Sequence, residues 1–336
     1  EHHVTADVAY GIYDYVRITK DLDFLYGRGA EVLTETARFW ASRCEYVTEK
    51  DRYEINQVTG PDEWHEPVNN NLYTNYFARW NLRYVMSLIR TMKEERPDDY
   101  EALMKKTGLK EEELEFWNTV QSKIYLPRKE GTNLLEQFEG YFQLKDVVID
   151  QYDENDWPIR PEALKTCKAR ETQILKQPDV VLLLHLLGEE FEPELMKENY
   201  DYYEKRTLHG SSLSPSIYSV MGLKVGDDSK AYRYLKRAAL IDLLNLQKNT
   251  REGIHAANAG GVWQTIVFGF AGVSIGKDGI LNVKPNMPKE WSSLKFRLHY
   301  DNAWLEIQTD GNNQAEVRRL DGAPVGIWIN GEKKEI

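Results

Sequence analysis

The chain has 336 residues, of which 41% are hydrophobic and 29% charged, a balance that is ordinary for a globular protein and argues against intrinsic disorder. The net charge is −11, and no stretch reaches the ~20 apolar residues of a membrane span, so we expect neither a nucleic-acid partner nor a membrane partner. Aromatic residues reach 12%, which favours equally a tyrosine-rich helical core and a site where rings stack on sugars.

The first residues already form a helical pattern. Residues 5–19 carry Tyr10, Ile12, Tyr13 and Val16 at helical spacing, and the chain begins with Glu1 rather than Met. A natural N-terminus is more often a frayed polar tail. We therefore expect the chain to be the later part of a longer polypeptide or one piece of a cleaved one.

Apolar stripes at helical spacing continue to about residue 275, interrupted by an irregular connection at 127–160 that is rich in Pro, Gly, Asp and aromatic residues. The stripes predict helices at 29–46, 72–94, 98–107, 111–125, 178–188, 193–206, 228–247 and 256–270. Successive helices with short connections favour a toroid or bundle of helical hairpins.

The pattern changes near residue 275, where Gly and Asn turns begin to separate short alternating runs. These runs predict strands at Lys295–Tyr300, Ala303–Gln308, Ala315–Leu320 and Val325–Asn330. We therefore predict a helical domain of residues 1–274 followed by a small β-sandwich of residues 275–336.

The segment TGPDEWHEPVNNN at 59–71 lies between two predicted helices, and its glycine and prolines exclude a regular helix. A rigid loop would place acidic side chains and His65 beside Trp64. Desolvation near an aromatic ring favours the protonated form of a carboxyl group, as a general acid requires. The alternatives are a solvated acidic loop and, for Asn71, a simple helix cap.

Three further segments carry candidate binding residues. Lys176 and Gln177 precede a helix. A Lys there opposes the helix dipole, which suggests a carboxylate or ligand partner; the alternative, equally weighted, is an ordinary solvated Lys. The HGSSLSPS turn at 209–216 has the backbone freedom and hydroxyls to wrap an anion, or it is a Ser-rich loop that caps a helix near Ser216. His255 opens a run of small residues and either donates to an anion or is a buried, satisfied histidine.

No metal or nucleotide cofactor is expected. The seven His form no HExxH-type pattern, and the sequence has neither a P-loop nor a GxGxxG motif. Cys44 and Cys167 lie far apart without metal-ligand spacing. Because a chain of this length has only two cysteines, we expect a reducing compartment and predict a cytoplasmic location.

Taken together and in this order, TGPDEWH–VNNNLYTN, LKQPDVV, HGSSLSPS and EGIHAANAGGVWQTIVFGF resemble the inverting disaccharide phosphorylases of glycoside hydrolase family 65. The resemblance covers the whole chain and implies a mainly α fold: part of an (α/α)6 barrel followed by a small, jelly-roll-like C-terminal β-sandwich. It also implies that the family's N-terminal β-sandwich, first barrel helices and sugar-contacting Trp-Asp motif are absent from this chain.

The resemblance implies roles for the matching residues. Glu63 corresponds to the general acid, Lys176 and Gln177 to residues that hold the glucosyl unit, and Ser211, Ser212 and His255 to the phosphate binders. Trp64 and His65 flank the acid and are expected to bind substrate. The full-length chain is expected to form a homodimer, as is usual in the family.

The implied reaction is the phosphorolysis of an α-glucoside, a disaccharide or glucosylglycerol, to β-glucose 1-phosphate and a free acceptor. An inverting hydrolase needs a base to activate water, whereas phosphate is already an anionic nucleophile. The nearest alternative is an inverting, acid-trehalase-like hydrolase, which would be expected to present a carboxylate at 209–212, where HGSS stands instead. The second is a non-catalytic carbohydrate-binding fragment.

Overall fold

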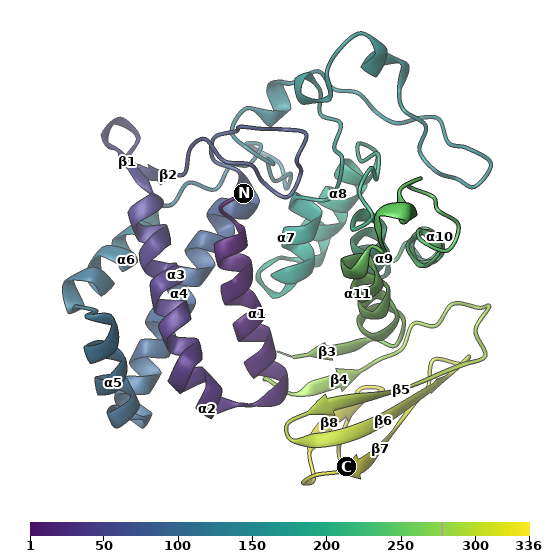
Figure 1. Cartoon of the computed structure of the whole chain (residues 1–336). Helices are drawn as coiled ribbons and strands as arrows, with labels where there is room; N and C mark the ends of the chain where they lie inside the picture. The colour runs from purple at the N-terminus through teal and green to yellow at the C-terminus, as the bar shows by residue number, and fades with distance from the viewer. Residues whose placement is uncertain (277) are drawn as a thin grey trace. The chain divides into compact units, whose positions relative to one another are not determined.

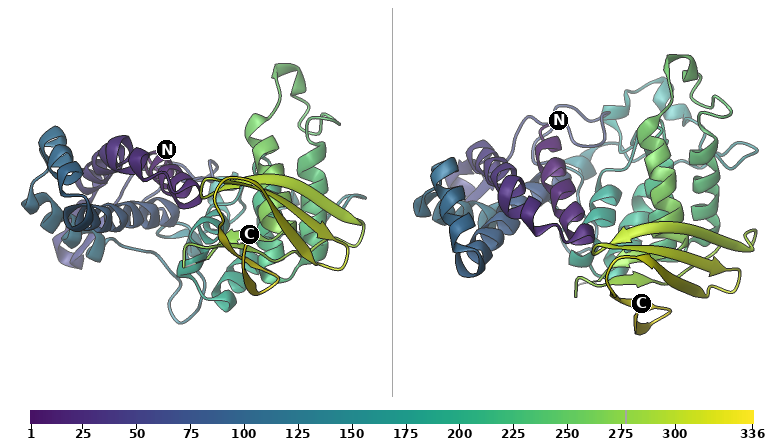
Figure 2. Two further views of the ribbon diagram at one scale, coloured as in Figure 1. Left: turned by 90° about the horizontal axis from the view of Figure 1, so that it is seen from below. Right: turned by 60° about the horizontal axis from the view of Figure 1, so that its bottom comes forward.

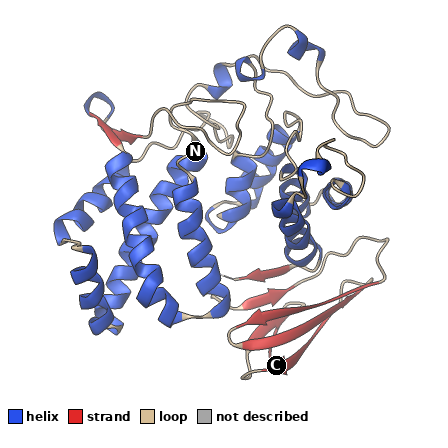
Figure 3. Cartoon of the chain, viewed as in Figure 1, coloured by secondary structure: helices blue, strands red, loops and turns tan. Residues whose placement is uncertain are grey.

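The computed structural model describes residues 1–276 and 278–336, which form two compact units, Glu1–Lys145 and Asp146–Ile336. Figure 1 labels the main elements, and Figure 3 separates helices from strands. The first unit contains α1 (Val4–Thr19), α2 (Leu22–Phe24), the π-helix Leu25–Gly29, α3 (Ala30–Arg43), β1 (Glu45–Val47), β2 (Arg52–Glu54), α4 (Leu72–Glu95), α5 (Pro97–Thr107) and α6 (Glu111–Lys123).

Aromatic side chains form much of the packing between α1 and α4 in the first unit. Trp80 and Tyr84 of α4 stack with their ring centroids 5.5 Å apart, and Tyr13 of α1 contacts both rings edge-on. Tyr10 adds contacts to Phe77 and Trp80. Such pairs add stability beyond the apolar area that they bury. A tyrosine-rich helical core therefore accounts for part of the aromatic excess of the sequence.

The second unit contains α7 (Val180–Leu186), α8 (Pro193–Glu204), α9 (Ser214–Val225), α10 (Asp228–Leu240) and α11 (Ala256–Gln264), which continues into a π-helix, Thr265–Phe270. Short 3-10 turns complete the helical elements of the two units at Thr48–Lys50, Tyr141–Gln143, Glu162–Lys165, Ala169–Glu171, Gly188–Glu190 and Thr250–Glu252. Asp227 caps α10, as expected, by accepting from the Lys230 backbone N–H at 3.3 Å.

The C-terminal part is formed by β3 (Val273–Ile275), β4 (Leu281–Val283), β5 (Ser293–Tyr300), β6 (Ala303–Asp310), β7 (Ala315–Asp321), β8 (Gly326–Ile329) and β9 (Glu332–Glu335). They make a sheet of order β3-β4-β8-β9, with β4 and β8 parallel, and an antiparallel sheet of order β5-β6-β7. Both views in Figure 2 show these strands gathered together. Gly272 precedes them at φ +63°, where a Cβ would lie 1.7 Å from the Lys284 carbonyl oxygen, so only glycine fits.

Most predicted elements are present, with some differences. The expected helix at 228–247 ends at Leu240, and the one expected from 178 begins only at Val180, because Pro178 and Asp179 lie outside the helix. Helix α9 was not among the predicted ranges, although a helix start near Ser216 was one alternative for this turn. It begins at Ser214, and the Ser216 hydroxyl donates to the Leu213 carbonyl instead of capping. The hairpin β1–β2 and strands β3, β4 and β9 are also additional to the prediction.

Candidate functional site

The loop 58–68, here called the acid loop, carries Glu63 and is closed at its base by hydrogen bonds within the first unit. The backbones of Val58 and Val68 pair in both directions, at 2.9 and 2.8 Å. Just outside them, the Asn70 N–H donates to the Ile55 carbonyl at 2.8 Å, and the Ile55 N–H donates to the Asn70 side-chain oxygen at 3.1 Å. The ends of the loop are therefore fixed by backbone pairing.

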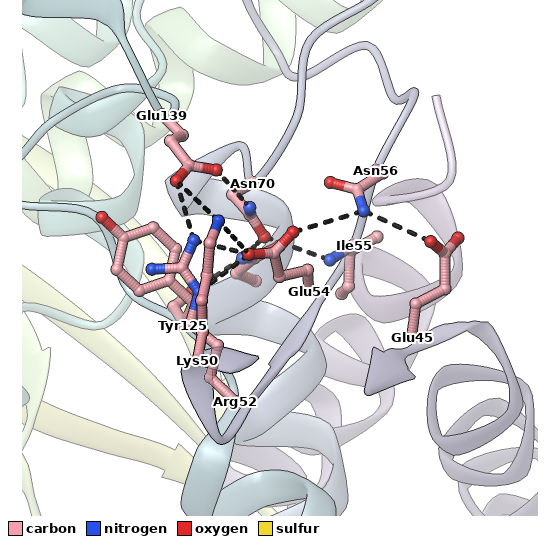
Figure 4. A network of polar contacts seen from close by, with 10 residues as sticks. Glu45, Lys50, Arg52, Glu54, Ile55, Asn56, Asn70, Tyr125 and Glu139 are labelled. Carbon is pink, nitrogen blue, oxygen red and sulfur yellow. Dashed lines mark hydrogen bonds and ion pairs between the residues drawn. The ribbon is translucent and has the colours of Figure 1, made fainter. Parts of the chain in front are cut away.

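A polar network around Asn70 supports this base (Figure 4). The Asn70 amide donates to Glu139 Oε2 at 2.8 Å, and Arg52 donates to the other Glu139 oxygen at 2.7 Å and to Glu54. The Arg52 guanidinium also lies over the Tyr125 ring, 3.5 Å from its centroid. Burial alone would raise the pKa of Glu139, but the hydrogen bonds from Arg52 and Asn70 outweigh it and lower that pKa, so the network holds a carboxylate.

A second contact lies inside the acid loop. The Asp62 carboxylate and His65 Nδ1 are 2.6 Å apart, and both side chains are almost completely buried. Gln137 donates to the same Asp62 oxygen at 3.3 Å, and the His65 ring packs against Phe138 and Tyr141. Asp62 and His65 therefore bend the loop tightly around the two residues between them.

Those two residues, Glu63 and Trp64, lie towards the outside of the loop. The Glu63 side chain is exposed and Trp64 is half-buried, whereas their neighbours Asp62 and His65 are buried. The base and interior of the loop are thus fixed, but the desolvation expected for the acid is not provided at Glu63, whose side chain is exposed among the described residues. His65 was predicted to bind substrate; in the structure its ring contacts Asp62, Phe138 and Tyr141.

In the second unit the predicted sugar-binding and phosphate-binding segments lie side by side. Leu175 and Thr207 form a parallel bridge, and the Gly210 N–H donates to the Lys176 carbonyl at 2.8 Å. This pairing brings Lys176, which is half-buried, and Gln177, which is 9% exposed, next to the turn that carries Ser211 and Ser212. Both serines are half-buried and directly precede α9.

Helices α9 and α11 pack closely and run in the same direction. A Cβ on Gly261 would lie 2.5 Å from Ser216 Oγ near the start of α9, and one on Gly269, further along, would lie 3.0 Å from Leu223 near its end. Thr265 adds a hydrogen bond from its hydroxyl to the Ser216 carbonyl at 3.3 Å. The N-termini of the two helices therefore lie at the same end, where their N–H groups and dipoles favour an anion.

His255 is the residue before α11 and therefore lies at this end. Its backbone N–H and its Nδ1 contact the two oxygens of Asp242 at 2.8 and 2.5 Å. The hydrogen bond from the His255 side chain lowers the pKa of Asp242. The contact between Nδ1 and Asp242 fixes the orientation of the ring. Nε2 lies on the opposite side of the ring, 3.4 Å from the Asn249 amide nitrogen.

The eight residues predicted for the site thus fall into two groups. The second unit brings Lys176, Gln177, Ser211 and Ser212 together and places His255 at the same end of the paired helices. The first unit places Glu63, Trp64 and His65 on the acid loop.

Sequence reasoning missed the residues that support these groups. Asp242, Glu139 and Arg52 lie outside the motifs, and Asn70, although it lies inside the first motif, was not assigned its contact with the distant Glu139. His209, by contrast, is the first residue of the HGSS motif, so the sequence alone could have identified it as a supporting residue.

Within 1–276 and 278–336, no three His, Cys, Asp or Glu side chains come together in a way that could hold a metal ion. Over the same ranges, none of the helices has the length and apolar character needed to cross a membrane.

Known protein families and individual proteins match most of this chain. Residues 1–264 match the glycosyl hydrolase family 65 central catalytic domain, and residues 275–336 match the family 65 C-terminal domain. The kojibiose phosphorylases of Caldanaerobacter subterraneus and Thermoanaerobacter brockii are 52% and 51% identical over 99% and 100% of this chain. The chain spans 43% of the length of each.

A solved structure of a candidate kojibiose phosphorylase from the human microbiome is 32% identical, with a TM-score of 0.86 over 99% of this chain and 43% of that one. Together with the two family matches, it confirms the predicted fold class: a helical portion of an (α/α)6 barrel followed by a C-terminal sheet domain.

Proposed function

Because this chain belongs to glycoside hydrolase family 65, we propose that it takes part in the inverting phosphorolysis of an α-glucoside to β-glucose 1-phosphate and a free acceptor. The relatives are disaccharide phosphorylases. Since the chain spans less than half of their length, activity is assigned to the complete gene product. Residues 1–274 would supply part of the catalytic barrel and residues 275–336 the C-terminal β domain.

The acid loop would supply the proton. Glu63 donates it to the glycosidic oxygen as the bond to the acceptor breaks, so that the acceptor leaves as a neutral alcohol. Trp64 offers an aromatic face to the substrate, and His65 holds the loop through Asp62 so that both neighbours keep their positions. Lys176 and Gln177 would bind the hydroxyl groups of the glucosyl unit.

The end shared by α9 and α11 would bind phosphate. Ser211 and Ser212 supply hydroxyl and backbone donors. The His255 ring, oriented by Asp242 through Nδ1, donates to the anion from Nε2 when that nitrogen also carries a hydrogen. Two helix N-termini at this end add to the attraction for an anion. This is the observation that carries the proposal, because a hydrolase needs a carboxylate base to activate water, whereas the 209–212 turn contains serines at the start of a helix.

The experiment is an end-product assay on the complete gene product with a panel of α-linked glucose disaccharides, beginning with kojibiose because the relatives reported above at 52% and 51% identity are named for it. Phosphorolysis predicts β-glucose 1-phosphate only when phosphate is present, with free glucose from the acceptor in equal amount. Equal turnover with and without phosphate, giving two glucose molecules, would instead establish a hydrolase.

Inorganic phosphate would be a substrate, and no cofactor is proposed. A homodimeric state stays a prediction from the family resemblance, and a cytoplasmic location stays a prediction from the cysteine content. Size-exclusion chromatography with light scattering tests the first, and subcellular fractionation tests the second.

A further inference from the structure

His209, the first residue of the HGSS motif, lies behind the turn that carries Ser211 and Ser212. Its ring is 2% exposed and its two nitrogens both have partners: Nδ1 lies 2.7 Å from the Ser214 hydroxyl, and Nε2 lies 3.0 Å from the Tyr234 hydroxyl. The His209 and Tyr218 rings also form a T-shaped pair, with their centroids 4.8 Å apart. A polar side chain so deeply buried must satisfy both nitrogens, so the direction of each bond matters.

The far end of this chain of hydrogen bonds fixes the direction. The Tyr234 hydroxyl donates to Glu204 at 2.9 Å, and the other Glu204 oxygen forms an ion pair with Lys230 at 2.8 Å. Burial and the adjacent Glu204 charge raise the pKa of Tyr234 well above its usual value, so the phenol keeps its proton. Because that proton points to Glu204, the phenol oxygen accepts from His209, and Nε2 must carry a hydrogen.

The other nitrogen is then an acceptor. Burial lowers the pKa of His209 to about 3, with the nearby charges of Lys230 and Arg237 acting in the same direction, so the ring is neutral and has a single N–H. With that hydrogen on Nε2, Nδ1 accepts a hydrogen bond from the Ser214 hydroxyl. The network therefore has one direction, from Ser214 through His209 and Tyr234 to Glu204.

Ser214 connects this hydrogen-bond network to the turn that carries Ser211 and Ser212. It is the first residue of α9, and its backbone N–H donates to the Ser211 carbonyl at 3.2 Å, which closes the turn 211–214. The start of the turn is held separately, by the Gly210 N–H on the Lys176 carbonyl. His209 itself has φ 50°, a left-handed conformation that is uncommon for a histidine and that its two side-chain bonds help to hold.

We propose that His209 is a positioning residue for phosphate binding, holding the Ser211–Ser212 turn through the Ser214 hydroxyl, with Tyr234 fixing the hydrogen of the ring. The proposal rests on the assignment of phosphate to this turn. His209 does not touch the phosphate; it sets the conformation in which the two serines donate.

The test is steady-state kinetics of the complete gene product with Ser214→Ala, which removes one hydroxyl with little change in volume. The KM for phosphate should rise about tenfold, the effect of one lost buried hydrogen bond, while the KM for the disaccharide and the kcat at saturating phosphate change less than threefold. Ser219→Ala is the matched control, because this serine is equally buried on the same helix but donates to the Ala231 carbonyl. Its phosphate KM should stay at the parent value.

Two substitutions of His209 test whether its side chain positions the Ser211–Ser212 turn or only stabilises the fold. The Asn oxygen in His209→Asn can take the place of Nδ1 as acceptor, and Asn tolerates φ 50°, so the phosphate KM should stay within about threefold of the parent. His209→Gln places its amide nearer Tyr234, loses the bond to Ser214 and should match Ser214→Ala. Combining His209→Gln with Ser214→Ala should add nothing further, because both remove the same bond.

The possible results separate a failure of the proposed function from a failure of this inference. If the parent protein forms no glucose 1-phosphate, the proposed function and this inference fall together. If the parent is active and Ser214→Ala keeps its phosphate KM, or Ser219→Ala raises it equally, the inference alone is wrong. If a His209 variant does not fold, as seen by circular dichroism, Ser214→Ala and its control still give the answer.

Discussion

The fixed base of the acid loop makes a sharp prediction for Asn70→Asp. The amide of Asn70 donates to Glu139 Oε2 at 2.8 Å, and its oxygen accepts from Ile55 and Asn75. The substitution keeps the shape and the acceptor oxygen but removes the donor and sets a second carboxylate against Glu139. The base of the loop should therefore open more often, although the fold around it is retained.

The size of the effect can be bounded. The lost hydrogen bond to a charged group is worth about 1.5–3 kcal/mol. Repulsion between two carboxylates adds to this, but the pair can take up a proton, and moving a carboxyl pKa from ~4 to ~7 costs about 4 kcal/mol, which sets the upper limit at pH 7. We expect about 3 kcal/mol, which is roughly a hundredfold increase in local opening.

The assay is hydrogen exchange of peptides covering residues 55–70, whose N–H groups at Ile55, Val58 and Val68 are hydrogen-bonded at the base of the loop. The introduced pair has a raised pKa in the folded state, so the destabilisation should be full near neutral pH. It should shrink as the pH falls through that raised value and be smallest below ~4, the unfolded carboxyl pKa, where the proton is bound in both states. Catalytic efficiency should fall with the loss of protection.

A compensating change tests the same reasoning. Adding Glu139→Gln to Asn70→Asp reverses the polarity of the bond, because the new amide can donate to the introduced carboxylate while its oxygen still accepts from Arg52. At least half of the lost protection should return. Parent-like exchange in the single variant at pH 7, or no recovery in the double variant, would refute the account of the loop base.

Four other predictions follow from the site. Glu63→Gln should lower the turnover of unactivated disaccharides by ~10²–10⁴-fold with substrate binding largely intact, measured by initial rates and by titration with the disaccharide. His255→Ala should raise the KM for phosphate far more than the KM for the sugar, measured by initial rates over a range of phosphate concentrations. Gly261→Ala should lower the free energy of unfolding by ~1–3 kcal/mol, because the new methyl group would lie 2.5 Å from Ser216 Oγ; adding Ser216→Gly should restore part of the loss in thermal unfolding. The hydrogen bond from His255 lowers the pKa of Asp242, so this contact should stabilise the fold above the unfolded carboxyl pKa of ~3.9. The stabilisation should be lost as the pH falls through the lower pKa of the folded state. Asp242→Asn should remove this sensitivity to acid.

Helices with one apolar stripe were predictable, and α4 shows why. Its buried residues recur at helical spacing, and Asn71 caps it by accepting from the Thr74 N–H at 2.9 Å, so both the pattern and the start were visible. Helix α9 was missed because it is buried on almost every side, from Ser214 to Gly222, and therefore has no stripe. The helix expected to reach residue 247 ends early although leucines continue; Leu243 and Leu244 are exposed.

The motifs predicted where the candidate site residues lie but not what holds them. The serine turn and Lys176 are adjacent in space because of backbone pairing between Leu175 and Thr207, which side-chain patterns do not reveal. Likewise, Glu139 supports Asn70 from a stretch that reads only as an irregular connection. Residues that act through partners far away in sequence leave no local signal, whereas His209 lies within a motif and could have been found.

The most direct measurement is the dependence of kojibiose cleavage on phosphate in the complete gene product, with the anomeric form of the released sugar phosphate followed by NMR. We predict a rate that saturates with phosphate, vanishes without it and yields the β anomer. Release of glucose at the same rate in phosphate-free buffer, or an α-configured product, would contradict attack by a bound oxyanion on the face opposite the protonated leaving group.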